Sequence, residues 1–399
     1  MANDTFTMSG KLYLPKSKEN YSPYRENTYD SGWMNRSLNL IINTDNGSQF
    51  LNMKAVKKTD DSNDLYFYDT KEKKRFKVPF RNRKDKEYLL KVPNTQKYTI
   101  DLEENPQIRR RIKTLIERIK DKKEVAPEEL AEFGASSAKE LVEIYKKSLA
   151  KRHEFLSPWD LILKVKEIVE SGEYKDTLFK VTGRIEINHY NGNDYFNYVP
   201  RLITIGNKES DEAAQARVTL FFDENAVSYD ESEQQLNIDG FLEYWDNTSS
   251  KNQFHKYSVI LPLKDETDPA KLERKRKHYE KLFSVDDADE VKSIGIIVDL
   301  INGSPTRKVT MDDLTDEQKE AIEFGDKTFE EIVREIGGNI REESIQANMY
   351  SKLQSGWNQA RKTSYQPYQL GYVTETPDEM DLDDDLVDLD EDDLPFDLD

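Results

Sequence analysis

Two stretches of this chain alternate apolar and polar residues with the period of a β-strand, and helical spacing lies between and after them. Residues 1–102 hold five or six short strands, two of them flanking Asn46-Gly47, a strong hairpin signal. The period of two returns at Thr177, where five strands and the turn signal Asn191-Gly192 follow within about 87 residues. Short strands with turn-rich joints favour small closed sheets, so the sequence predicts two β-modules.

The pattern as a whole predicts an α+β protein: two small β-barrel modules, helical connectors and a disordered acidic C-terminal tail. We expect an N-terminal β-rich basic module over 1–104, a helical connector over 105–172, a second barrel over 173–265, a helical region over 266–353, a linker over 354–377 and the tail over 378–399. The tail is expected to be disordered because it cannot bury enough apolar surface to offset the entropy of ordering.

Charge is distributed unevenly along the chain, whose formal net charge is −19. The tail, residues 378–399, carries 13 acidic residues and no basic ones, whereas the other 377 residues hold 65 acidic and 59 basic residues. Residues 1–100 hold 19 basic and 12 acidic residues, and the densest part, 71–86, has nine bases and two acids. A basic module joined to an acidic tail offers polyanions a positive surface, which an evenly acidic protein lacks.

Composition excludes many functions. The absence of cysteine removes disulfides, thiolate metal sites and a cysteine nucleophile, and four scattered histidines leave little for a histidine metal centre. No phosphate-binding loop, dinucleotide fingerprint or H-E-x-x-H motif is present, and no apolar run is long enough to span a membrane. The N-terminus has no charged region before an apolar stretch. We therefore expect a cytoplasmic protein that is not an enzyme and holds no cofactor or metal.

Two strands of the second module share the form apolar-x-Gly-x-apolar. Val181 to Ile185 is the first, and Ile238 to Leu242 is the second, followed by Tyr244-Trp245, a polar loop and the segment 255–259. Glycine at such positions is typical of a sheet that bends sharply to close.

These segments resemble the oligonucleotide-binding fold of bacterial single-stranded DNA-binding proteins. Residues 180–187 resemble their first strand, 237–261 their long hairpin, and 391–396 their acidic tip, which docks replication and repair partners. In this chain Asp397, Leu398 and Asp399 follow the Pro-Phe pair, so Phe396 does not carry the free carboxylate. The resemblance implies oligonucleotide-binding-like barrels, coating and protection of single-stranded DNA in replication or recombination, and partner recruitment by the tail. A bacteriophage-encoded version, acting in the host cytoplasm, would fit the larger two-barrel build.

A sequence-tolerant binder of single strands needs cations that follow phosphates and flat rings on which bases stack. Aromatic and basic residues cluster in the loop before residue 37, in the basic run 71–86 and along the second module. The expected nucleic-acid-binding residues are Tyr21, Tyr24, Arg25, Tyr29, Trp33, Arg36, Lys73, Lys74, Arg75, Phe76, Arg81, Arg83, Arg184, Tyr195, Tyr198, Arg201, Phe241, Trp245, His255 and Lys256. The expected partner-binding residues are Asp392, Asp393, Leu394, Pro395 and Phe396.

Other interpretations stay open at this point. Any one aromatic here could pack in a core, and a charge run could be a solvated face. A non-enzymatic scaffold or adaptor of a replication or virion assembly, with the tail as its docking peptide, is the main alternative. A nucleic-acid mimic is a third, although the basic run 71–86 argues against it.

A short internal repeat is also present. Residues 131–134 lead into 140–144 with the same pattern as 322–325 leading into 331–336, which would follow from duplication of a barrel and its helices.

We predict that removing residues 378–399 tightens binding of single-stranded DNA. A tail with 13 acidic residues competes with phosphates for the same cations, and its loss removes that competition. Fluorescence anisotropy with labelled oligo-dT at low and high salt measures the change. Equal affinity of the full and shortened chains at every salt concentration would contradict competition.

Overall fold

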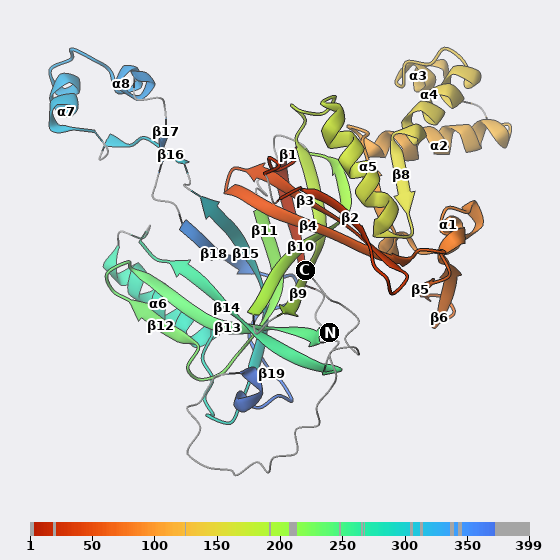
Figure 1. Cartoon of the computed structure of the whole chain (residues 1–399). Helices are drawn as coiled ribbons and strands as arrows, with labels where there is room; N and C mark the ends of the chain where they lie inside the picture. The colour runs from red at the N-terminus through yellow and green to blue at the C-terminus, as the bar shows by residue number, and fades with distance from the viewer. Residues whose placement is uncertain are drawn as a thin grey trace, which may run out of the picture.

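The computed structural model describes residues 4–18, 21–123, 125–190, 193–206, 214–246, 249–264, 266, 268–303, 306–311, 314–335, 339–341 and 345–371 (Figure 1). The predicted acidic tail and its five candidate partner-binding residues lie outside these ranges. Strands dominate the described residues, and helices form a smaller part. Every helix among them is too short or too polar to cross a lipid bilayer.

The strands are β1 (Thr5–Tyr13), β2 (Tyr24–Thr28), β3 (Trp33–Thr44), β4 (Gly47–Lys58), β5 (Asp64–Asp69), β6 (Lys74–Pro79), β7 (Tyr98–Asp101), β8 (Arg152–Phe155), β9 (Phe179–Tyr190), β10 (Asn193–Ile205), β11 (Ala214–Phe222), β12 (Val227–Asp230), β13 (Gln235–Asp246), β14 (Lys251–Pro262), β15 (Lys292–Gly303), β16 (Thr306–Lys308), β17 (Asn339–Arg341), β18 (Ile345–Leu353) and β19 (Arg361–Lys362). The helices are α1 (Lys86–Lys91), α2 (Pro106–Lys120), α3 (Pro127–Ala131), α4 (Ala138–Ala150), α5 (Pro158–Ser171), α6 (Pro269–Leu282), α7 (Asp316–Glu323) and α8 (Phe329–Glu335), with short 3-10 turns η1 (Phe80–Asn82), η2 (Asn94–Gln96) and η4 (Pro367–Leu370).

Strand β1 joins the two predicted β-modules into one sheet. Its residues 5–10 pair with β9, residues 5–8 also pair with β11, and residues 11–13 pair with β3. Through these pairings, strands of both modules belong to one 15-stranded sheet, so two separate barrels are not confirmed. The hairpin predicted at Asn46-Gly47 is confirmed, because β3 and β4 pair across that turn.

Hydrogen bonds close part of this sheet into a ring of five strands, in the order β11, β13, β14, β18 and β15. The pairing of β14 with β18 is parallel, and the other four are antiparallel. We call this ring one half of the sheet. The other half lies across β1 and consists of the hairpins β3–β4 and β9–β10, which both pair with β1, and β10 lies against β4.

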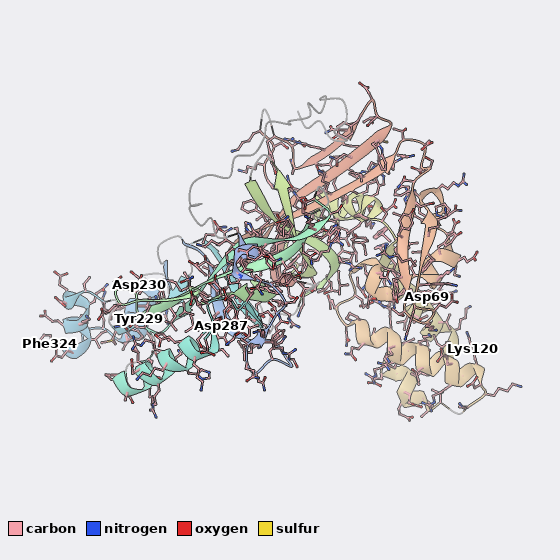
Figure 2. The ribbon with its side chains drawn as sticks, turned by 90° about the horizontal axis from the view of Figure 1, so that it is seen from below. Asp69, Lys120, Tyr229, Asp230, Asp287 and Phe324 are labelled. Carbon is pink, nitrogen blue, oxygen red and sulfur yellow. The ribbon has the colours of Figure 1, made fainter. Side chains whose placement is uncertain are left out.

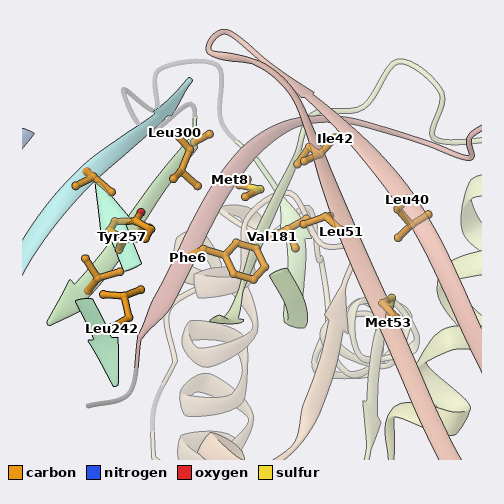
Figure 3. Close-up of a cluster of buried hydrophobic side chains, with 14 of the residues drawn as sticks. Phe6, Met8, Leu40, Ile42, Leu51, Met53, Val181, Leu242, Tyr257 and Leu300 are labelled. Atoms are coloured by element: carbon orange, nitrogen blue, oxygen red, sulfur yellow. The ribbon is translucent and has the colours of Figure 1, made fainter. Parts of the chain in front are cut away.

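One large core fills the space between these strands. Phe6 and Met8 of β1 are fully buried at its centre, with the side chains of β3 and β4 on one side and Leu242 and Tyr257 on the other (Figure 3). Helix α5 covers β3 and β4 with Trp159 and its apolar stripe. The core therefore spans both halves of the sheet, because β1 supplies side chains to both.

The segment between β4 and α5 carries two small satellite cores. Hairpin β5–β6 packs Phe67 and Val78 against Val92 and Leu156. Helices α2 and α4 pack around Ile112 and other apolar residues of α2, and α2 begins after Asn105, whose side chain accepts the Gln107 N–H. These units lie beside the main sheet (Figure 1).

The C-terminal described segment packs on the sheet where the sequence predicts a linker. Residues 354–371 fall within the predicted linker 354–377, yet Leu370 is fully buried and Trp357 packs over Gly295. Tyr365 contacts the rings of Phe221 and Phe254, edge to face, and donates its hydroxyl hydrogen to Glu243. We name residues 354–371 the C-terminal strap.

Substituting Gly183 with alanine is expected to destabilise the fold. Gly183 of β9 lies under the Phe6 ring, and an added Cβ would stand 2.0 Å from the Val199 carbonyl oxygen and 2.6 Å from that ring. Overpacking of this kind costs about 1–3 kcal/mol. Urea unfolding followed by tryptophan fluorescence measures the loss. The control is Ser9→Ala on β1, which removes a buried hydroxyl without a partner and should be neutral or stabilising; equal effects of the two substitutions would refute the packing argument.

The free energy of unfolding should depend on pH through Asp4. Burial raises the pKa of Asp4 from 3.8 to about 7, although the Thr219 N–H donates to its carboxylate, and Glu243 adds repulsion. The pKa of Asp4 is higher in the folded state than in the unfolded state. Its stabilising contribution to the free energy of unfolding is therefore fully present below the unfolded pKa and is lost as pH rises from about 4 to about 7. The slope is at most about 1.4 kcal/mol per pH unit. Asp4→Asn keeps the acceptor and should flatten this slope in urea unfolding between pH 4 and 8. Identical slopes for the two proteins would exclude Asp4 as the cause.

Candidate nucleic-acid interface

An open groove of about 510 Å³ lies where the two halves of the sheet meet. It is lined by β4, β10, β14, β15 and β18, which bring together residues some 300 positions apart. We name it the central groove. Its lining residues are Gln49, Phe50, Phe196, Tyr198, His255, Lys256, Tyr257, Ser258, Ile260, Leu300, Ile301, Asn302, Gln346, Ala347 and Asn348.

Aromatic rings form one part of the central groove. Phe50 is 61% exposed, and the ring centroid of Phe196 lies 5.0 Å from that of His255 and 5.6 Å from that of Tyr257. Tyr198 is partly buried with its ring edge-to-face to Phe6, and burial raises the pKa of Tyr198 to about 12, so its hydroxyl stays protonated at neutral pH. Flat apolar surfaces of this size suit the stacking of planar rings.

Amide side chains and one cation form the other part. Asn302 donates its amide to the Ser48 carbonyl oxygen at 2.6 Å, and Asn348 donates to the Ser258 carbonyl oxygen at 3.0 Å. These bonds fix both amide groups and leave their side-chain oxygens able to accept from a ligand. Lys256 is exposed and lies 3.3 Å from a carboxylate oxygen of Asp239. The groove therefore combines stacking surfaces, fixed acceptors and a positive charge.

A second groove of about 800 Å³ lies on the outer face of β2, β3 and β4. We name it the edge groove. Tyr21, Arg25 and Tyr29 line it, together with polar side chains such as Asn52 and Lys54. Asn39 donates to the Tyr21 hydroxyl and Asn35 donates to the Tyr29 hydroxyl, both at 3.4 Å, and the Arg25 guanidinium lies 5.8 Å from the Tyr21 ring centroid.

The outer face of β4 connects the two grooves. Phe50 lines the central groove, whereas Asn52 and Lys54 line the edge groove. These residues alternate with the buried Leu51 and Met53, so all three share one face and follow one another at about 7 Å.

The structure brings six of the predicted residues into these grooves. Tyr198, His255 and Lys256 line the central groove, and Tyr21, Arg25 and Tyr29 line the edge groove. The side chain of Tyr195 lies outside the described residues.

Most of the other predicted residues lie on the surface away from both grooves. Trp33 and Trp245 are 37% and 44% exposed at strand ends. Lys73, Lys74, Arg75, Arg81 and Arg184 are exposed. Tyr24 and Phe76 lie partly buried beneath Lys166 and Lys91, and Arg201 donates to the Thr95 carbonyl oxygen at 2.6 Å.

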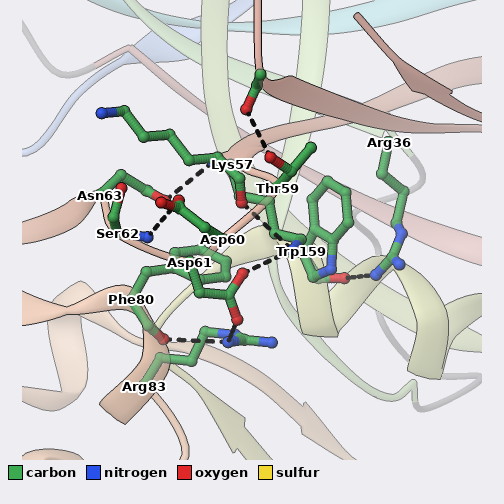
Figure 4. Close-up of polar contacts among 12 residues, drawn as sticks. Arg36, Lys57, Thr59, Asp60, Asp61, Ser62, Asn63, Phe80, Arg83 and Trp159 are labelled. Atoms are coloured by element: carbon green, nitrogen blue, oxygen red, sulfur yellow. Dashed lines mark hydrogen bonds and ion pairs between the residues drawn. The ribbon is translucent and has the colours of Figure 1, made fainter.

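Arg36, Arg83 and Phe241 require a correction, because the structure buries or pairs the groups that were expected to bind. Arg36 stacks on Trp159 with its guanidinium 3.8 Å from the ring centroid, donates to the Trp159 carbonyl oxygen and pairs with Glu26 (Figure 4). Arg83 pairs with Asp61 and with Asp160, to which it donates at 2.6 Å.

Phe241 is 4% exposed, in a small core with Phe221, Val291 and Leu370, the last of which belongs to the C-terminal strap. Alternation along β13 places Phe241 on the face of the strand opposite to that of Leu242. It does not reveal that the strap covers this second face.

Sequence reasoning missed Phe50 and the two fixed asparagines, and it noted the aromatic residues around Phe196 without including Phe196 among the expected binding residues. Phe50 had a usable signal: it falls on the polar face of β4, between Ser48 and Asn52, where an apolar ring has no core to enter. Asn302 and Asn348 had none, since amides are common in strands that end at a surface. Within the described ranges, no three His, Asp or Glu side chains gather closely enough to share a metal ion.

Comparison with known proteins gives structural likenesses only. No protein-family model matches the chain, and no curated protein matches it in sequence. Among solved structures, the chain is similar to the wild-type single-stranded DNA binding protein from Thermus aquaticus, at 9% identity and a TM-score of 0.27, over 75% of this chain and 85% of that one. A deletion mutant of the same protein matches at 10% identity and a TM-score of 0.25, over 75% and 86% of the two chains. At these TM-scores the likeness does not establish a shared fold.

Proposed function

We propose that this chain binds single-stranded DNA without strong sequence preference, in the central groove and along the outer face of β4. The observation that carries the proposal is the exposed ring of Phe50 facing the same open groove as the Phe196–His255 pair, beside Lys256 and two fixed amides. Unpaired bases offer flat faces to such rings, and each stacked base contributes about 1–3 kcal/mol.

The polar groups support the same ligand. The side-chain oxygens of Asn302 and Asn348 can accept from the exocyclic amines of bases, and the cations of the two grooves can follow phosphates. Paired bases hide their ring faces inside a duplex, so the groove favours single strands over double strands. Preference for single strands also separates this function from a scaffold or adaptor role.

The wider role follows from the resemblance described above. In this proposal each half of the sheet is an oligonucleotide-binding-like barrel, and the protein coats and protects single-stranded DNA during replication or recombination without catalysing a reaction. The acidic tail recruits protein partners and competes with DNA for the cationic surface. A bacteriophage-encoded protein acting in the host cytoplasm is consistent with this build.

Substituting Phe50 with alanine should weaken binding of oligo-dT about tenfold, because about 1.4 kcal/mol of stacking is lost. His255→Ala should act in the same direction, and the double variant should lose more. Fluorescence anisotropy with a labelled strand of several tens of nucleotides measures the affinity. The log–log salt slope should stay unchanged in Phe50→Ala, because no phosphate contact is removed.

The matched control is Tyr368→Ala, since Tyr368 is an 80% exposed aromatic that lines neither groove. It should bind like the original chain. Equal losses in Phe50→Ala and Tyr368→Ala, with unchanged thermal unfolding in both, would place the interface elsewhere.

A further inference from the structure

Two helical hairpins in this chain repeat the same local structure. Helix α3 ends at Ala131 and is followed by the turn Glu132-Phe133-Gly134, and helix α7 ends at Glu323, the first residue of the matching turn Glu323-Phe324-Gly325. Both glycines are left-handed, with φ of 72° and 77°, and their N–H groups donate to Ala131 O at 2.9 Å and Ile322 O at 3.1 Å. The short sequence repeat is therefore a structural repeat.

The second helix of each hairpin begins in the same way. The Ser137 hydroxyl accepts the Glu140 N–H at 3.3 Å, and the Thr328 hydroxyl accepts the Glu331 N–H at 3.3 Å. The next residue in each case, Leu141 or Ile332, is buried in a small core that its hairpin shares with the segment before it. Residues of α3 can therefore be matched to residues of α7.

In the first copy, two arginines of helix α2 reach the outer face of α3. Arg111 forms an ion pair with Glu132 and holds its guanidinium 5.1 Å from the Phe133 ring centroid. Arg118 donates to Glu129 at 2.6 Å. Arg111 and Arg118 are seven residues apart, so they lie on one face of α2, with Leu115 buried between them.

In the second copy the same groups are present without a covering helix. Glu320, Glu323 and Phe324 match Glu129, Glu132 and Phe133, and all three are exposed. Phe324 is 75% exposed at the end of its helix (Figure 2). No described residue forms an ion pair with Glu320 or Glu323. The hairpin projects from the sheet, so no other described helix reaches it (Figure 1).

We propose that α7–α8 docks a helix of a partner protein that carries two basic residues seven positions apart with an apolar residue between them. Such a helix would place its cations against Glu320 and Glu323 and cover Phe324, as α2 does on α3. The chain's own α2 is engaged by Glu129 and Glu132, so it is not the occupant. A nucleic acid is not the occupant either, because the two carboxylates repel phosphates. This inference does not depend on DNA binding.

The probe is a labelled peptide with the sequence of residues 105–122, which keeps α2 with its Asn105 cap and both arginines. Fluorescence anisotropy with the full chain should detect binding. Glu323→Lys and Phe324→Ala should each weaken binding of the peptide at least about tenfold. The first variant removes a charge-assisted contact, and the second removes a ring that the peptide would bury. The matched controls are Glu330→Lys, an exposed glutamate on α8, and Tyr368→Ala.

A charge swap makes the test specific. A peptide with Arg111→Glu and Arg118→Glu should bind the original chain poorly and regain affinity for the chain with Glu320→Lys and Glu323→Lys. Circular dichroism verifies that each variant is folded. No binding of the original peptide, or equal weakening by Glu323→Lys and Glu330→Lys, would overturn the proposal, whereas single-strand binding should be unaffected in every variant.

Discussion

The structure depends on β1, a single strand with three neighbours. Its first half is held between β9 and β11, and its second half turns to β3 at residue 11. Phe6 and Met8 fill the centre of the core in consequence, so neither half of the sheet can complete its core without this strand. Because backbone hydrogen bonds and apolar burial both pass through β1, the two halves should unfold together and not as independent domains.

The central groove is a product of this joint. Phe50 on β4 and His255 on β14 belong to different halves of the sheet, and both line the groove between them. β1 and the parallel pairing of β4 with β15 join the two halves, and residues of β15 and β18 line the groove between them. A groove made in this way can be rigid without a loop to close it, and rigidity reduces the entropy lost when a flexible strand binds.

Local features of the fold could be predicted from sequence, whereas the contacts between distant segments could not. The turn at Asn46-Gly47 and the helix cap at Asn105 involve only a few neighbouring residues, so the local sequence determines the hairpin and the helix start. Phe241 shares its small core with Leu370, and Arg36 stacks on Trp159, each more than 120 residues away in the sequence. For the same reason, alternation separates the two faces of a strand but does not indicate which outer face another segment covers.

The repeated hairpin separates what a sequence motif determines from what its surroundings determine. Both copies form the same turn and the same cap, because glycine and the hydroxyl residue act locally. Their outer faces differ: in one copy Arg111 and Arg118 neutralise two glutamates and cover a ring, and in the other the matching groups stay exposed. Local folding does not require Glu320, Glu323 and Phe324 to match the first copy, since solvent-facing positions tolerate most residues. Retaining all three on one face is therefore better explained by binding than by folding.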